Sequence, residues 1–101
     1  MKKINILYIG MHAEIRETVV RITNNNEAWK CTGTGDVAEA RELFSQTDTD
    51  LVLLGAGLDE NTETELRSYF ATVNPQVKVV QHYGGGSGLL ANEILHALEG
   101  A

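Results

Sequence analysis

Few side chains in this sequence could act as catalytic groups, and they lie far apart along the chain. His12 follows an apolar run and could bind a ligand or act as a base, while His82 and Tyr83 end a later apolar run. No acidic or nucleophilic partner is identifiable for His12, so a solvated loop histidine is favoured, and edge-strand packing is favoured for the other two. His96 is expected at the surface. We therefore expect no catalytic residue and no enzyme.

A run of glycines near the C-terminus could bind an anion instead. Backbone N–H groups before a helix hold phosphate groups well, and the run Gly84–Gly88 precedes a helical pattern. It lacks the Lys-Ser/Thr pair of a phosphate-binding loop and the spacing of a dinucleotide-binding motif. A linker is favoured, with a small-anion or nucleotide site as the alternative. The residues of that alternative site are His12, Gly84, Gly85, Gly86 and Ser87.

Metal binding and thiol chemistry have little support in the sequence. The single cysteine, Cys31, excludes an internal disulfide and a cysteine-based zinc site. It stands near Trp29 in a β-like stretch, which indicates a packed thiol. Asp59 and Glu60 are interpreted as the start of a helix rather than as metal ligands. We expect no metal and no cofactor.

Composition narrows the class of protein further. The chain has 101 residues, of which 43% are hydrophobic and 22% charged, and we interpret it as one domain, 1–101. A net charge of -6 with scattered basic residues argues against a nucleic-acid partner. The apolar run Ile4–Ile9 is too short for a leader peptide, and no segment approaches the roughly 20 apolar residues of a membrane span. We expect a cytoplasmic protein with no membrane partner.

Hydrophobic periodicity predicts alternating strands and helices. Helical spacing of apolar residues follows each predicted strand, and Asp36 is expected to cap the second helix. Glycines at 33 and 35 mark a loop before it, and Asn74-Pro75 ends the third helix. The predicted strands are 4–9, 28–32, 51–54 and 77–83.

This alternation indicates an α/β fold with a parallel sheet. The first and third strands are almost wholly apolar, as expected of central strands. The second carries Lys30 and the fourth carries Lys78, which is typical of edges. The expected order is 2-1-3-4, and the loops after the first and third strands then meet at the edge where such folds place their sites.

Four stretches in order resemble the receiver domain of bacterial two-component response regulators. "ILYIGMHAEIRE" is similar to the receiver opening, "GTGDVAEARELF" to its second turn and helix, "TDLVLLGAGL" to its third strand, and "NPQVKVVQHYG" to its fourth. The resemblance covers about residues 4–84. It implies a flavodoxin-like, three-layer α/β/α architecture with four strands, one fewer than a receiver.

The same resemblance implies that the receiver's chemistry is missing. Its two metal-binding acids would fall at Gly10 and Met11, its phosphorylated aspartate at Gly55, and its switch Ser or Thr at Tyr83. The loop after "DLVLL" offers only Gly55, Ala56 and Gly57. Gly55 and Gly57 are expected to ease a turn. The interpretation is a shortened pseudo-receiver.

A second resemblance is an alternative to the first. The B subunits of sugar phosphotransferase systems have a similar length, four parallel strands and a similar closing helix. Their phosphorylated cysteine follows the first strand, where this chain has Ile9-Gly10-Met11, and Cys31 is elsewhere. A relative of that group would also be inactive.

These observations predict an interaction or signalling module that is not phosphorylated on aspartate. The predicted fourth strand is a free edge, and the last helix carries Leu89, Leu90, Ile94, Leu95 and Leu98. We expect a homodimer through that strand, that helix or both, or else another protein partner.

Overall fold

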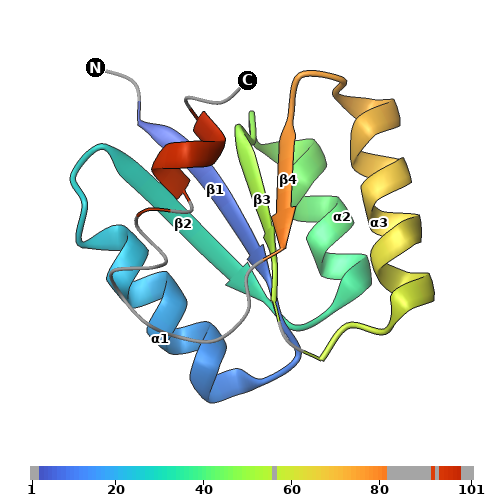
Figure 1. Cartoon of the computed structure of the whole chain (residues 1–101), viewed down its shortest axis with the longest axis horizontal. Coiled ribbons are helices and arrows are strands. Elements are labelled where there is room, and N and C mark those ends of the chain that lie inside the picture. The colour runs from blue at the N-terminus through green and yellow to red at the C-terminus, as the bar shows by residue number, and fades with distance from the viewer. Residues whose placement is uncertain (1–2, 56, 82–91, 93, 99–101) are drawn as a thin grey trace.

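The computed structural model describes residues 3–55, 57–81, 92 and 94–98 of the chain. Strands and helices alternate along it, and residues 92 and 94–98 are helical (Figure 1). The elements are β1 (Ile4–Ile9), α1 (Ala13–Asn24), β2 (Trp29–Thr34), α2 (Val37–Gln46), β3 (Leu51–Leu54), α3 (Glu60–Val73) and β4 (Lys78–Gln81).

The described strands form one parallel sheet in the order β2-β1-β3-β4, which confirms the predicted order. The register pairs Ile6 of β1 with Cys31 of β2 and with Leu51 of β3, and Leu51 pairs with Lys78 of β4. All four β3 residues are buried, whereas all four β4 residues are partly exposed. Polarity along each strand therefore identified the centre and the edges correctly.

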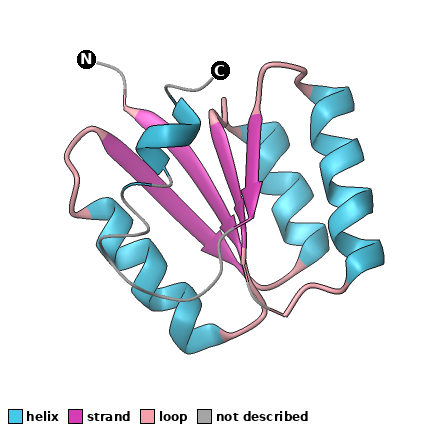
Figure 2. Cartoon of the chain, viewed as in Figure 1, coloured by secondary structure: helices cyan, strands magenta, loops and turns pink. Residues whose placement is uncertain are grey.

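Helices cover both faces of this sheet, so the architecture is three-layered as predicted (Figure 2). Successive strand residues point to opposite faces, which divides the apolar side chains into two clusters. One cluster lies under α1 and the C-terminal helical residues, and the other lies under α2 and α3. Buried members of the first are Ile6, Tyr8, Val19, Trp29, Cys31, Leu51, Leu53 and Ile94, and those of the second are Leu7, Ile9, Ala40, Phe44, Val52, Leu54, Leu66 and Phe70.

Polar side chains cap the first turns of the helices. The Asp36 carboxylate accepts hydrogen bonds from the N–H groups of Ala38 and Glu39, at 2.8 and 3.3 Å, which confirms it as the cap of α2. Asp59 accepts from the N–H of Thr62 at 2.7 Å and caps α3. Each cap satisfies N–H groups that have no partner within the helix.

Three strand boundaries differ from the prediction. β2 begins at Trp29 rather than at Ala28. Gly33 and Thr34 belong to β2 rather than to a loop, because Thr34 pairs with Ile9 and its carbonyl accepts from the N–H of Gly10 at 3.0 Å. Val77 precedes β4, since its N–H donates to Asn74 in a turn. His82 and Tyr83, the predicted end of that strand, lie outside the described residues.

Gly57 has a positive φ of 93°, so one of the two turn glycines has the predicted role. A Cβ at this position would also lie 2.6 Å from the Cβ of Met11, which leaves no room for a side chain. Gly55 does not have a positive φ, so its backbone conformation does not explain why it lacks a side chain.

Cys31 is buried in the first core cluster, 5% exposed, as its neighbours in the sequence predicted. Burial raises the pKa of its thiol from 9.0 to about 12, and the Thr23 hydroxyl lowers it slightly. The thiolate is the reactive form, so the folded protein holds Cys31 in its unreactive form at neutral pH. None of the helices in the described part is long and apolar enough to cross a membrane.

The raised pKa of Cys31 predicts a loss of stability at alkaline pH. Below the unfolded-state pKa near 9, both states hold the proton and stability is unaffected; above it, only the folded thiol keeps the proton. The free energy of unfolding should therefore fall as pH rises from about 9 through 12. Urea titrations at pH 7 and 10 measure this fall, and Cys31→Ala should make it smaller. An equal fall in both proteins would contradict the assignment.

Candidate functional site

The loops after β1 and β3 meet at one edge of the sheet, as the strand order requires. Ile9 pairs with Leu54, and the N–H of Gly55 donates to the carbonyl of Ile9 at 2.7 Å. Gly10 and Gly55 therefore lie side by side where the two central strands end. Gly55 is buried, and Met11 next to it is 38% exposed.

The side chain of Tyr8 fills the space above both glycines. Tyr8 lies two residues before Gly10 on the same face of β1 and is only 1% exposed. A Cβ added to Gly10 would lie 2.6 Å from its ring and 2.8 Å from its hydroxyl oxygen. A Cβ on Gly55 would lie 2.8 Å from the ring carbon Cε1 and still nearer the hydroxyl. No side chain fits at Gly10 or Gly55 unless Tyr8 moves.

The sequence analysis did not identify Tyr8 as part of this site. One signal in the sequence could have found it. Tyr8 is a large aromatic residue on a central strand, two positions before a glycine, and the neighbouring central strand also ends in glycine. Glycine is suited to such close approaches because it has no Cβ. The two glycines and the tyrosine are therefore parts of one packed arrangement.

Arg16 is a second residue at this edge that the sequence analysis left out. Its Nη1 donates a hydrogen bond of 2.8 Å to the carbonyl of Gly10. Its side chain lies against Gly33 and Gly35, where a Cβ would be 3.1 Å from Cγ and 3.2 Å from Cζ of Arg16, respectively. The positively charged guanidinium therefore lies beside the backbone oxygen that Gly10 could have offered to a metal ion and repels a cation there.

His12 caps α1. Its Nδ1 accepts a long hydrogen bond of 3.4 Å from the N–H of Ile15, and its side chain is exposed. A groove of about 230 Å³ beside it is lined by His12, Glu14, Ile15, Thr18 and Val19. The other residues proposed for anion binding, Gly84, Gly85, Gly86 and Ser87, and the switch position Tyr83 lie outside the described residues.

Among residues 3–55, 57–81, 92 and 94–98, no group of three His, Cys, Asp or Glu residues could hold a metal ion, at this edge or elsewhere. Asp59 is the acid nearest in sequence to the loop, and it is the cap of α3. The hydrogen bonds from Thr62 hold the pKa of Asp59 below its usual value.

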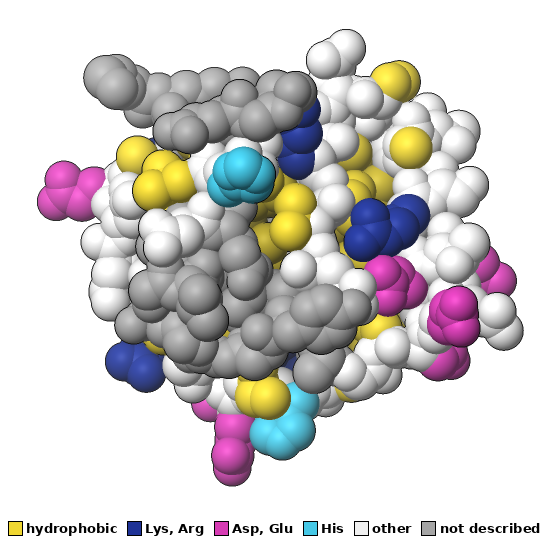
Figure 3. Space-filling view, in the orientation of Figure 1, with side chains coloured by type: hydrophobic (Ala, Val, Ile, Leu, Met, Phe, Trp, Pro, Cys, Tyr) yellow, Lys and Arg dark blue, Asp and Glu magenta, His cyan; other side chains and the backbone are white. Residues whose placement is uncertain are grey.

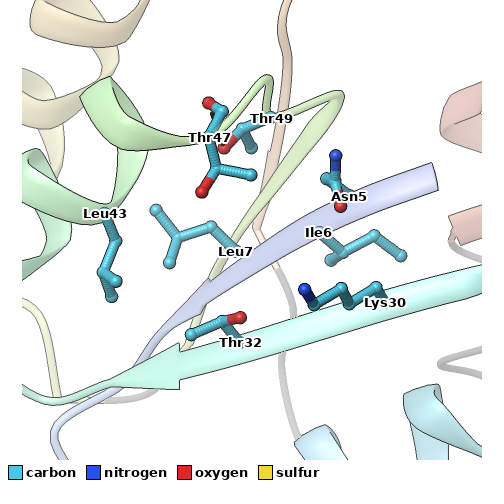
Figure 4. A pocket seen from close by; sticks show the side chains of 8 residues that line it. All are labelled: Asn5, Ile6, Leu7, Lys30, Thr32, Leu43, Thr47 and Thr49. Carbon is cyan, nitrogen blue, oxygen red and sulfur yellow. Dashed lines mark hydrogen bonds between the residues drawn. The ribbon is translucent and has the colours of Figure 1, made fainter. Parts of the chain in front are cut away.

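A small cavity lies at the other end of the sheet, between β1, β2 and α2 (Figure 4). Its volume is about 50 Å³, room for one or two water molecules. The Asn5 amide donates to the carbonyl of Asp48 at 3.1 Å, and the Thr49 hydroxyl donates to that of Thr47 at 3.5 Å. These polar groups are satisfied within the fold, and the cavity is too small for a nucleotide.

Solved structures similar to this one include receiver domains. The signal receiver domain of an HD domain-containing protein from Pseudomonas fluorescens Pf-5 is similar with a TM-score of 0.83 at 14% identity, over 98% of this chain and 89% of that one. The receiver domain of the stress response regulator RcsB from Escherichia coli gives 0.66 at 12%, over 95% and 76%. A response regulator receiver protein from Pseudomonas putida gives 0.63 at 16%, over 96% and 81%.

The sequence itself matches no protein-family model and no curated protein. The likeness therefore rests on the arrangement of strands and helices, which agrees with the motifs in the sequence. This chain is a receiver-like domain of flavodoxin-like fold.

Proposed function

We propose that this chain is a pseudo-receiver, a non-catalytic signalling module that binds a protein partner and is not phosphorylated on aspartate. One observation carries the proposal: the Tyr8 ring occupies the space into which side chains at Gly10 and Gly55 would project. The site is filled by the core, so it is closed to a phosphoryl group as well as deprived of its acids. A module of this kind would work in the cytoplasm of a bacterium.

The chemistry of phosphoryl transfer supports this proposal. Transfer to a carboxylate requires the acceptor itself and a cation that neutralises the phosphate charge. Mg²⁺ prefers carboxylate oxygens and water, but Gly10, Met11 and Gly55 carry no carboxylate. The Gly10 carbonyl already accepts from Arg16.

Binding of a small anion or nucleotide at these loops has less support. Tyr8 fills the space between the loops, and His12 is used as a helix cap. An inactive relative of the sugar phosphotransferase B subunits is the other alternative, whereas the similar solved structures are receiver domains. The cysteine of those subunits has no counterpart here, because Cys31 is buried in β2.

The proposal predicts that the protein does not accept a phosphoryl group. Incubation with acetyl phosphate and Mg²⁺ should leave the intact mass unchanged, because Gly55 replaces the acceptor. Beryllofluoride with Mg²⁺ should leave the NMR spectrum unchanged for the same reason. A receiver domain that retains its acids serves as the positive control. A stable phosphorylation of Asp59 would overturn the proposal.

The packing of Tyr8 on Gly55 predicts strong coupling between the two positions. Gly55→Ala adds only the Cβ that meets the Tyr8 ring and imposes no backbone strain, since φ is not positive. It should cost about 1–3 kcal/mol of unfolding free energy. With Tyr8→Val already present, the same change should cost at least about 1 kcal/mol less. Urea denaturation of the two single variants and the double variant measures this, and simple additivity would refute the steric argument.

The homodimer expected from the sequence stays a prediction. Leu95 on the C-terminal helix is 46% exposed and offers an apolar contact. Light scattering at tens of micromolar should give about twice the chain mass of 11.0 kDa. Leu95→Glu should lower that mass if the helix forms the interface. A strictly monomeric wild-type protein would leave a different chain as the partner.

A further inference from the structure

The two edges of the sheet differ in how their outward-facing backbone groups are satisfied. At the β2 edge, the Asn24 side chain pairs with Cys31 as a neighbouring strand would. Its Oδ1 accepts from the Cys31 N–H at 2.8 Å, and its Nδ2 donates to the Cys31 carbonyl at 3.0 Å. The outward N–H and carbonyl of Cys31 therefore both have partners, so another strand cannot pair with β2 at Cys31.

At the β4 edge, the corresponding groups are met only in part. The N–H of Lys78 donates to the carbonyl of Asp50, so the backbone N–H and carbonyl of Lys78 point toward β3. Those of the next residue, Val79, point away from the sheet. Nη1 of Arg67 donates to the Val79 carbonyl at a long 3.4 Å. The described residues provide no acceptor for the Val79 N–H. Within the described part of the chain, Val79 therefore offers one free donor and one weakly held acceptor at this edge.

The side chains over this edge can move away at little cost. Arg67 is also bonded to Glu63, with 3.3 Å between Nε and Oε1, and Gln81 donates to the other carboxylate oxygen of Glu63 at 3.0 Å. The Arg67 side chain is 42% exposed and that of Glu63 19%. The bond that must break for a strand to add is the one from Nη1 of Arg67 to the Val79 carbonyl. The hydrogen bond from Arg67 to the Val79 carbonyl is weak because it is long.

An open groove runs beside β4 on the face that carries the C-terminal helix. Its volume is about 300 Å³, and it is lined by Val77, Lys78, Val79, Val80, His96 and Ala97. Figure 3 shows hydrophobic surface between that helix and β4, with a histidine and basic side chains at its margins. An extended segment paired with β4 would lay every second side chain into this groove.

The charges around the edge select the kind of segment that fits. Lys78 and His96 border the groove, while Arg67 on the opposite face of the strand is paired with Glu63. Lys78 is therefore the positive charge of the groove lining, in a chain whose net charge is -6. Complementary charge on the partner is therefore negative.

We propose that the outer edge of β4 binds an extended, acidic segment of a partner protein, which adds to the sheet as a fifth strand. Its backbone pairs with the N–H and carbonyl of Val79 after Arg67 has turned away, and its acidic side chains lie near Lys78. The proposal deepens the interaction module proposed above and rests on it. Main-chain pairing gives affinity in this mode of recognition, and the side-chain pockets give specificity.

The test uses a short fluorescein-labelled peptide of alternating valine and glutamate, with a valine–lysine peptide as the matched probe. Fluorescence anisotropy should show saturable binding of the acidic peptide alone. In ¹⁵N NMR spectra, the Val79 amide should shift most, because it gains an acceptor. The proposal is overturned if the acidic peptide does not bind, or if the NMR shifts are centred on α1 or β2. Either result leaves the proposed function intact as long as the protein accepts no phosphoryl group.

Two variants and one control sharpen the result. Val79→Pro removes the outward N–H without removing a bond to β3, a position where edge strands tolerate proline, and should abolish binding while the melting transition persists. Lys78→Glu should weaken binding of the acidic peptide about fivefold. Lys30→Glu, the matched reversal on the β2 edge, should have no effect. Equal losses in Lys78→Glu and Lys30→Glu would contradict the site.

Self-association is distinguished in the same experiment. If the wild-type protein is a dimer that Val79→Pro dissociates and Leu95→Glu does not, a second copy occupies β4 and the acidic partner segment is excluded. A dimer that survives Val79→Pro leaves the edge free for the proposed segment.

Discussion

The ring of Tyr8 fills the space between the ends of β1 and β3. Tyr8, Gly10 and Gly55 lie so close that a Cβ on either glycine would overlap the phenol. Close packing excludes a second group there, because a protein interior has no spare volume. This edge of the sheet is therefore part of the hydrophobic core.

Neighbouring contacts depend on this arrangement. The Gly10 carbonyl accepts from Arg16, and the guanidinium lies across Gly33 and Gly35. Met11 packs its Cβ near Gly57, the glycine with positive φ. Packing and a structural hydrogen bond therefore fix the residues around the end of β1.

Sequence reasoning predicted the fold well because its signals are local. Alternating strands and helices, polar residues on β2 and β4, and the caps Asp36 and Asp59 follow from periodicity and from side-chain chemistry. Tyr8 was missed because motif comparison shows which groups are lost and not which side chain fills the vacated volume. The end of β2 was missed because Gly33 was taken as a turn signal. There it instead gives room for the side chains of α1.

The contrast between the two sheet edges explains where a partner could be accommodated. A primary amide such as Asn24 offers a donor and an acceptor at the spacing of a peptide group, so it closes both bonds at Cys31. A guanidinium has donors only, so Arg67 can satisfy the carbonyl of Val79 but never its N–H. Replacement of a neighbouring strand by side chains is thus complete at Cys31 and half complete at Val79. This difference in side-chain chemistry, rather than in exposure alone, favours β4 as the edge proposed to accept another strand.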